Sequence, residues 1–78
     1  MKLWGYSKKE RDAGEVRLIE LAEASLLATP AELRRIAAFL SDAADNMDCM
    51  GGDYDHEHLG DRQPGFEDSP HLVVARAK

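Results

Sequence analysis

The side chains best suited to chemistry gather in one short segment, residues 53–58, which reads Asp-Tyr-Asp-His-Glu-His. Imidazole nitrogens and carboxylate oxygens are ordinary ligands for zinc or nickel, and His56 and His58 would share a face if the segment were extended. A third histidine, His71, follows further along the chain. One interpretation of the segment is therefore a divalent-metal site, in a metal-binding protein or a metal-dependent enzyme.

Several features of the sequence weigh against a metal. Cys49 is the only cysteine, so no pair of thiolates accompanies the histidines. A spacing of two residues would put His56 and His58 on different faces of a helix, and the i, i+4 histidines of a catalytic zinc helix are missing. We predict no metal and no cofactor, and we retain His56, His58 and His71 as the candidate ligands of the alternative hypothesis.

Nucleophilic catalysis has little support either. A serine or cysteine nucleophile needs a base and an orienting group beside it. Cys49 falls near the expected C-terminal end of a helix, where the helix dipole disfavours a thiolate. A phosphate-binding glycine loop would open a helix, whereas Gly51-Gly52 follows one. We therefore predict a protein that binds a partner and has no catalytic residues.

Charge is distributed unevenly along the chain, whose formal net charge is −5. Residues 2–11 hold four cationic side chains against one carboxylate, whereas residues 45–68 hold eight carboxylates against Arg62 alone. Phosphate binding requires a clustered basic surface, so this balance argues against nucleic acid as the partner. An acidic segment can attract a basic protein, or it can simply keep a small protein in solution.

Two aromatic residues, Tyr54 and Phe66, lie within the acidic segment. Aromatic residues often anchor protein interfaces, although they can equally attach a loop to the core. We predict that a protein partner contacts this segment, through a surface made of Asp53, Tyr54, Asp55, Glu57, Asp61 and Phe66.

The clearest structural signal is a helix start at residues 29–32, Thr-Pro-Ala-Glu. Threonine can cap free backbone amides, proline is tolerated at the first helical position, and the glutamate can complete a capping box. The pattern predicts an amphipathic helix over residues 30–50, ended by Gly51-Gly52, with Leu40 in the middle of its buried face. That face consists of Leu33, Ile36, Ala37, Leu40, Ala43, Ala44 and Met47.

Short strands are expected on either side of this helix. Residues 2–7 place Trp4 and Tyr6 on one side at period two, and residues 71–77 contain two adjacent valines. Residues 15–28 fit a helical stripe as well as an interrupted alternation. We favour a strand over residues 18–28, because the first strand needs a neighbour to pair with.

The remaining residues are expected to be irregular. Residues 8–14 resemble a polar turn, and residues 53–69, rich in Gly, Asp and Pro, resemble a long loop. The predicted fold is thus one small two-layer α+β domain over residues 1–78, with a three-stranded, mostly antiparallel sheet and one long helix. One helix covers one face of such a sheet, so the other face must be polar or meet a partner, and a structural homodimer through it is a further hypothesis.

The sequence also carries expectations about compartment. Its apolar runs are far shorter than the roughly 20 residues that a bilayer crossing requires. The first residues do not show the positively charged segment followed by an apolar segment that is typical of a secretory signal. A single cysteine cannot form an intrachain disulfide. We predict a cytoplasmic protein.

Several stretches resemble the immunity protein 32 family of bacterial polymorphic toxin systems. The resemblance rests on the run from Glu23 to Leu40, on Ala44 to Met47, on His56-Glu57-His58-Leu59 and on the closing Leu72-Val73-Val74. It implies a bacterial cytoplasmic protein that neutralises a cognate toxin by direct binding, with no chemistry of its own. It also supports a strand over residues 18–28.

Overall fold

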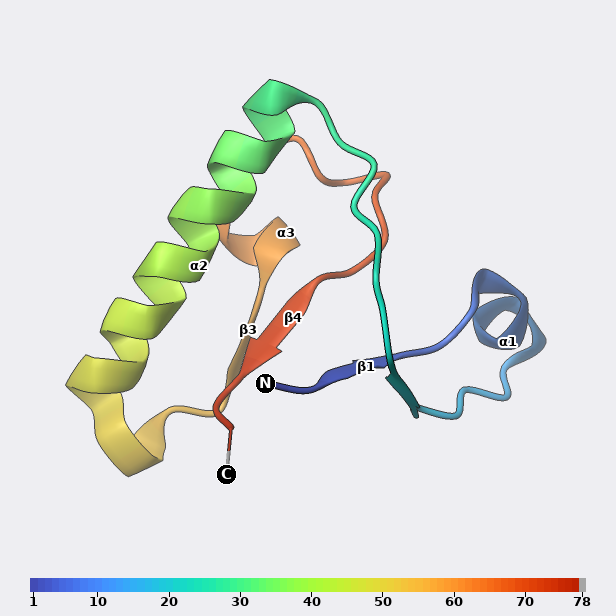
Figure 1. Ribbon diagram of the computed structural model, residues 1–78, viewed down its shortest axis with the longest axis horizontal. Coiled ribbons are helices and arrows are strands. Elements are labelled where there is room, and N and C mark those ends of the chain that lie inside the picture. Colours follow the sequence, from blue (N-terminus) through green and yellow to red (C-terminus); the bar gives the residue numbers. More distant parts are fainter. Residues whose placement is uncertain (78) are drawn as a thin grey trace.

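A single long helix, α2, runs along one side of the molecule, and short strands and helices make up the rest (Figure 1). The computed structural model describes residues 1–77 and is an α+β structure, as predicted. In chain order the elements are β1 (Leu3–Gly5), α1 (Lys8–Ala13), β2 (Ile19–Leu21), α2 (Pro30–Met50), a 3-10 turn (Gly51–Asp53), β3 (His56–His58), α3 (Leu59–Arg62) and β4 (Val73–Ala75).

Helix α2 begins and ends where the sequence predicts. The Thr29 hydroxyl accepts a hydrogen bond from the Glu32 amide at 3.1 Å, and the Glu32 carboxylate accepts one from the Thr29 amide at 2.8 Å. These two bonds form the predicted capping box. At the other end Gly51 has a φ of 57°, and the Arg76 guanidinium donates to the carbonyl oxygens of Met47 and Gly51. A cation there also offsets the negative end of the helix dipole.

The buried face of α2 differs from the predicted one. Ile36, Phe39 and Ala43 are buried, and Phe39 is only 1% exposed, whereas Leu40 is 47% exposed. The prediction that Leu40 lies in the middle of the buried face is therefore wrong. The apolar residues of α2 extend around more of the helix than the elements beside it can cover, and the bulky Phe39 occupies the centre of the contact.

The strands pair in two separate antiparallel ladders, each of two strands. Strand β1 pairs with β2, so that Leu3 lies opposite Leu21, and β3 pairs with β4, so that His58 lies opposite Val73. The predicted single three-stranded sheet is not confirmed. The last strand pairs with β3, which lies within the expected loop of residues 53–69, and not with a strand preceding α2.

Three other segments differ in detail from the predictions. The polar turn at residues 8–14 is the helix α1, capped by the Ser7 hydroxyl and ended by Gly14 at a φ of 73°. The expected loop contains β3 and α3 as well as turns. Each predicted strand is present but spans three residues only, and residues 22–28 form an extended connection to α2 instead of a strand.

The core lies entirely in the second part of the chain. All seven buried side chains of residues 1–77 fall between residues 36 and 66. Four of them form one apolar cluster against the partly buried Leu72 and Val74, and these four are Ile36, Phe39, Leu59 and Phe66.

We call residues 29–77 the body and residues 1–22 the arm. The body packs α2 and α3 against the β3–β4 ladder, while the arm consists of α1 and the β1–β2 ladder (Figure 1).

Within residues 1–77, the helices lack the combination of length and hydrophobicity that crossing a bilayer demands.

Candidate partner-binding site

The six residues predicted to contact a partner divide into two groups. Asp53, Asp55 and Asp61 are exposed, as a contact surface requires. The other three, Tyr54, Glu57 and Phe66, are each 8% exposed. Phe66 belongs to the apolar core, so in this structure it attaches the acidic segment to α2 and is not available on the surface.

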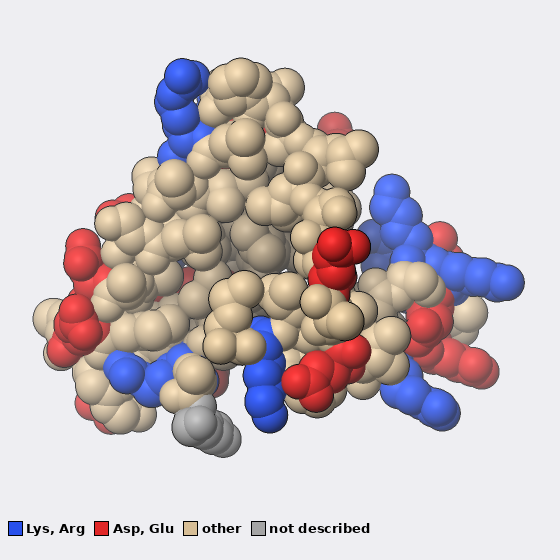
Figure 2. Space-filling model, in the orientation of Figure 1, with Lys and Arg blue, Asp and Glu red and all other residues tan. Residues whose placement is uncertain are grey.

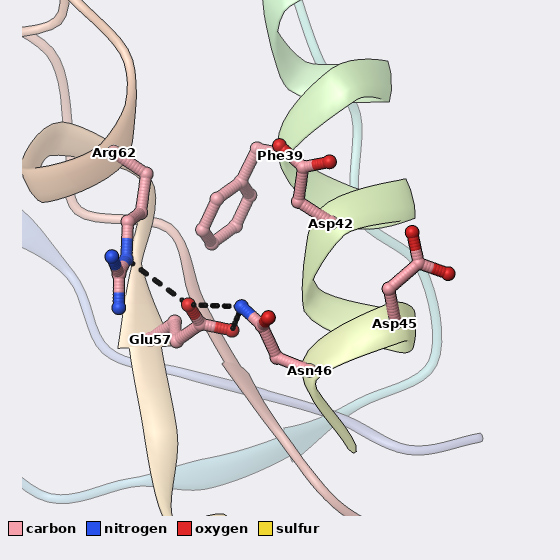
Figure 3. A pocket seen from close by; sticks show the side chains of 6 residues that line it. All are labelled: Phe39, Asp42, Asp45, Asn46, Glu57 and Arg62. Atoms are coloured by element: carbon pink, nitrogen blue, oxygen red, sulfur yellow. Dashed lines mark hydrogen bonds and ion pairs between the residues drawn. The ribbon is translucent and has the colours of Figure 1, made fainter. Parts of the chain in front are cut away.

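Glu57 is a buried carboxylate with a complete set of partners. Its two oxygens accept hydrogen bonds from the Asn46 amide at 3.0 and 3.3 Å and from the Tyr54 hydroxyl at 3.0 Å. The Arg62 Nε lies 3.0 Å from Glu57 Oε1 and forms an ion pair with it (Figure 3). Burying an ionised carboxylate costs several kcal/mol unless it is paired and hydrogen-bonded, and these contacts supply the compensation.

The alternation of side chains along β3 explains why Glu57 points inward. Glu57 is buried, while its neighbours His56 and His58 point to the other face of the ladder. Asn46 comes from α2, Tyr54 precedes β3, and Arg62 ends α3. The Glu57 network therefore joins three elements of the body at one point.

The Tyr54 hydroxyl depends on this environment. Burial raises the pKa of Tyr54 above its ordinary value, and the hydrogen bond to Glu57 and the charge of Glu57 raise it further. The phenol is therefore held in its neutral form, in which it donates to the carboxylate.

A cleft of about 290 Å³ opens beside the Glu57 network, between α2 and α3 (Figure 3). The Arg62 side chain is largely exposed at this cleft. Two further carboxylates line it, Asp42 and Asp45 on α2, and the sequence interpretation missed both. Their spacing along α2 could have identified them. Asp42 lies three residues after Phe39 and four before Asn46, and Asp45 lies three residues after Asp42. The full lining is Phe39, Asp42, Asp45, Asn46, Glu57 and Arg62.

We call five exposed carboxylates of the body the acidic surface. Two of them line the cleft from α2, and the other three lie on the turn before β3 and on α3. Arg62 is the one cation of residues 45–68, and its ion pair with Glu57 offsets part of its charge. The acidic surface consists of Asp42, Asp45, Asp53, Asp55 and Asp61.

The three histidines of the metal hypothesis lie near one another, outside the cleft. The rings of His56 and His58 share a face of β3, as predicted for an extended segment, with centroids 5.2 Å apart. His71 follows at 6.2 Å from His58, and His56 Nδ1 lies 2.9 Å from an oxygen of Asp55. The rings meet edge to face, and residues 1–77 contain no group of three His, Cys, Asp or Glu side chains arranged to hold a metal ion.

A comparison with known families places the chain. The sequence profile described as Immunity protein 32 matches residues 23–77. No curated protein and no solved structure matches the chain. The matched residues include all of the body with its core, the Glu57 network and the acidic surface, and they leave out the arm. The resemblance seen in the sequence is thus confirmed, and the chain belongs to the immunity protein 32 family.

Proposed function

We propose that this protein neutralises a cognate bacterial toxin by binding it directly, through the acidic surface of the body and without catalysis. Membership of an immunity protein family is the observation that carries the proposal. We place the binding in the cytoplasm of the cell that makes the toxin, where a protective protein is needed.

The charge of the body supports this mode of binding. Residues 29–77 hold ten carboxylates against four Lys and Arg side chains. A surface of this sign attracts a basic partner over a distance and accelerates the encounter, whereas it repels polyanions such as nucleic acids. The partner that fits is a protein with a basic surface, such as a toxin that itself handles a polyanionic substrate.

The contact residues of the proposal are those that a partner can reach. Asp53, Asp55 and Asp61 are exposed members of the originally predicted set, and the exposed Asp42 and Asp45, which line the cleft, extend it onto α2. The buried Tyr54, Glu57 and Phe66 support this surface from beneath. They fix the turn before β3 and the position of α3 relative to α2, so the carboxylates are held in place before the partner arrives.

The experiment begins with the genes adjacent to this one: a toxin found encoded there is co-expressed with the protein. Wild-type protein is expected to restore growth and to purify in a complex with one copy per toxin. The variant Asp53→Asn, Asp55→Asn, Asp61→Asn is expected to lose most of the protection. A matched control, Glu15→Gln, Glu20→Gln, Glu23→Gln, removes three exposed carboxylates outside the body and should protect fully.

Two outcomes would contradict the proposal. Full protection by the triple Asp variant would show that the acidic surface does not contact the toxin. Protection by far less than one copy per toxin would indicate that the protein modifies or degrades the toxin, which is catalysis and not occlusion.

A further inference from the structure

The C-terminal end of helix α2 carries side chains of an unfavourable charge. This end is the negative end of the helix dipole, so cations stabilise it and carboxylates destabilise it. Asp48 nevertheless lies in the last turn and Asp45 in the turn before it, and the last turn contains no basic residue. Asp53 and Asp55 follow shortly after the helix, and both are exposed. Helix α2 therefore ends among four carboxylates.

A cation from a distant part of the sequence reaches this end of the helix. Arg76 follows strand β4, and its Nη2 donates hydrogen bonds to the carbonyl oxygens of Met47 and Gly51, the latter at 3.3 Å. From the middle of α2 to the end of β4, Arg62 is the single Lys or Arg side chain, and it pairs within the Glu57 network. Figure 2 shows red side chains along the lower part of α2, with a blue side chain among them near the end of the helix.

The same guanidinium also contacts the turn that precedes β3. Gly51 is the first residue of this 3-10 turn, and its carbonyl oxygen accepts a second hydrogen bond, from the Tyr54 amide at 3.2 Å. The antiparallel register of β3 and β4, continued by one pair beyond the ladder, brings Asp55 opposite Arg76. The turn that carries Asp53 is therefore connected to the end of α2 and to β4 through one side chain.

We propose that Arg76 positions the acidic surface, because its guanidinium fastens the turn before β3 to the end of α2 and offsets the charge of the carboxylates gathered there. The part of this proposal that concerns toxin binding rests on the proposed function. Asp45 lies on α2, whereas Asp53 and Asp55 lie on or beside the turn, so the contact between these elements sets the distances between the carboxylates. A surface that is ordered before binding loses less conformational freedom in the complex, so it releases its partner more slowly.

The first test uses the free protein and follows the order of the turn. In the variant Arg76→Gln the backbone order parameters of residues 51–55, measured by NMR relaxation, should fall from about 0.85, typical of rigid backbone, to below about 0.6. The matched control is Arg34→Gln, which removes an exposed cation from the other end of α2 and should leave the turn as in wild type. A turn as rigid in Arg76→Gln as in wild type would overturn the proposal.

The second test concerns the charge of the carboxylates. Arg76→Gln should lower the melting temperature by about 4 to 8 °C, because the end of α2 loses its cation. In a background of Asp45→Asn and Asp48→Asn the same change should lower it by at most about half as much, since the charges that Arg76 offsets are absent. Equal losses in the two backgrounds would mean that Arg76 caps the helix without offsetting the carboxylates.

The third test uses the toxin found encoded beside this gene, and the two possible roles of Arg76 predict different rates. Loss of its charge alone makes the body more acidic, which speeds association with a basic toxin and does not speed dissociation. Loss of a positioning contact should speed dissociation by roughly tenfold. Arg34→Gln changes the charge by the same amount and should not raise the dissociation rate. Equal dissociation rates in Arg76→Gln and Arg34→Gln would overturn the role of Arg76 in binding.

Failure of the proposed function would look different. In that case the triple Asp variant binds the toxin as tightly as wild type. If instead Arg76 does not position the acidic surface, the triple Asp variant is impaired while Arg76→Gln dissociates like Arg34→Gln. Circular dichroism shows whether each variant is folded. Should Arg76→Gln alone not fold, the order parameters and rates are compared in the background of Asp45→Asn and Asp48→Asn, in which the loss of the cation costs less stability.

Discussion

The body and the arm of this protein differ in what holds them together. The body has a small apolar core centred on Phe39, a buried and fully paired carboxylate, and a long helix with a capping box. The arm has a three-residue ladder, a six-residue helix and side chains that remain at least partly exposed. The family match follows the same division, since it covers the body and begins after the arm. Stability and toxin binding are therefore expected to depend on the body, with little contribution from the arm.

The largest expected effect comes from the centre of the core. Phe39→Ala should lower the free energy of unfolding by about 3 to 5 kcal/mol, enough to unfold much of a protein of this size, because it leaves a cavity among Ile36, Leu59 and Phe66. Leu40→Ala, one residue away but exposed, should cost less than about 1 kcal/mol in dilute protein. Urea unfolding followed by circular dichroism measures both. Equal losses in the two variants would mean that the assigned face of α2 is wrong.

The next effect concerns the Glu57 network. Glu57→Gln should destabilise the protein by roughly 1 to 3 kcal/mol, because the change weakens the hydrogen bonds to Asn46 and Tyr54 and removes the ion pair with Arg62. Asp68→Asn, at an exposed carboxylate, should change stability by no more than about 0.5 kcal/mol. The same urea titration tests this pair. A Glu57→Gln protein as stable as the control would show that the network does not hold the body together.

A smaller effect, with a defined pH dependence, is expected at Tyr54. The pKa of Tyr54 is raised in the folded protein above the ordinary tyrosine value of 10.0. The neutral phenol therefore stabilises the folded protein fully below pH 10.0, and this contribution is lost as the pH rises through the raised pKa. Tyr54→Phe should cost about 1 kcal/mol at neutral pH through the lost hydrogen bond to Glu57. Thermal melts between about pH 8 and pH 11 should show the difference between wild type and Tyr54→Phe shrinking at high pH. A constant difference would contradict the assigned role of the phenol, and Tyr6→Phe is the control.

The smallest effect on folding is expected in the arm. Trp4→Ala should leave the unfolding of the monomer within about 0.5 kcal/mol of wild type, because Trp4 lies outside the core and is already more than half exposed. The measurement is a thermal melt followed by circular dichroism, with wild type alongside. A large loss would show that the arm is part of the folding unit and that the contrast between the two regions is mistaken.

The sequence predicts those features that depend on neighbouring residues. The capping box of α2 is one, because Thr29, Pro30 and Glu32 lie within four residues and form the cap by themselves. Its end at Gly51 is another. Helix α1 was missed although it has a similar local cap, because its six residues contain a single apolar side chain, Ala13, and so give no periodic pattern.

Features that depend on distant residues could not be predicted in this way. Strand β3 reads His-Glu-His, which has no apolar residue, and it is a strand because β4 pairs with it some 17 residues later. The burial of Glu57 depends on Asn46, which lies 11 residues earlier on a different element. The choice between Phe39 and Leu40 as the buried residue depends on where β3–β4 and α3 meet a helix that is apolar over a wide arc.

We expect the acidic surface of the body to guide a basic toxin to its binding site. The most direct test is the association rate of purified toxin with wild-type protein and with the Asp53→Asn, Asp55→Asn, Asp61→Asn variant, measured by stopped flow at low and high salt. We expect the variant to associate at least roughly tenfold more slowly at low salt, with a weaker dependence on salt. Equal association rates and equal salt dependence in the two proteins would contradict the claim and leave the acidity a role in solubility alone.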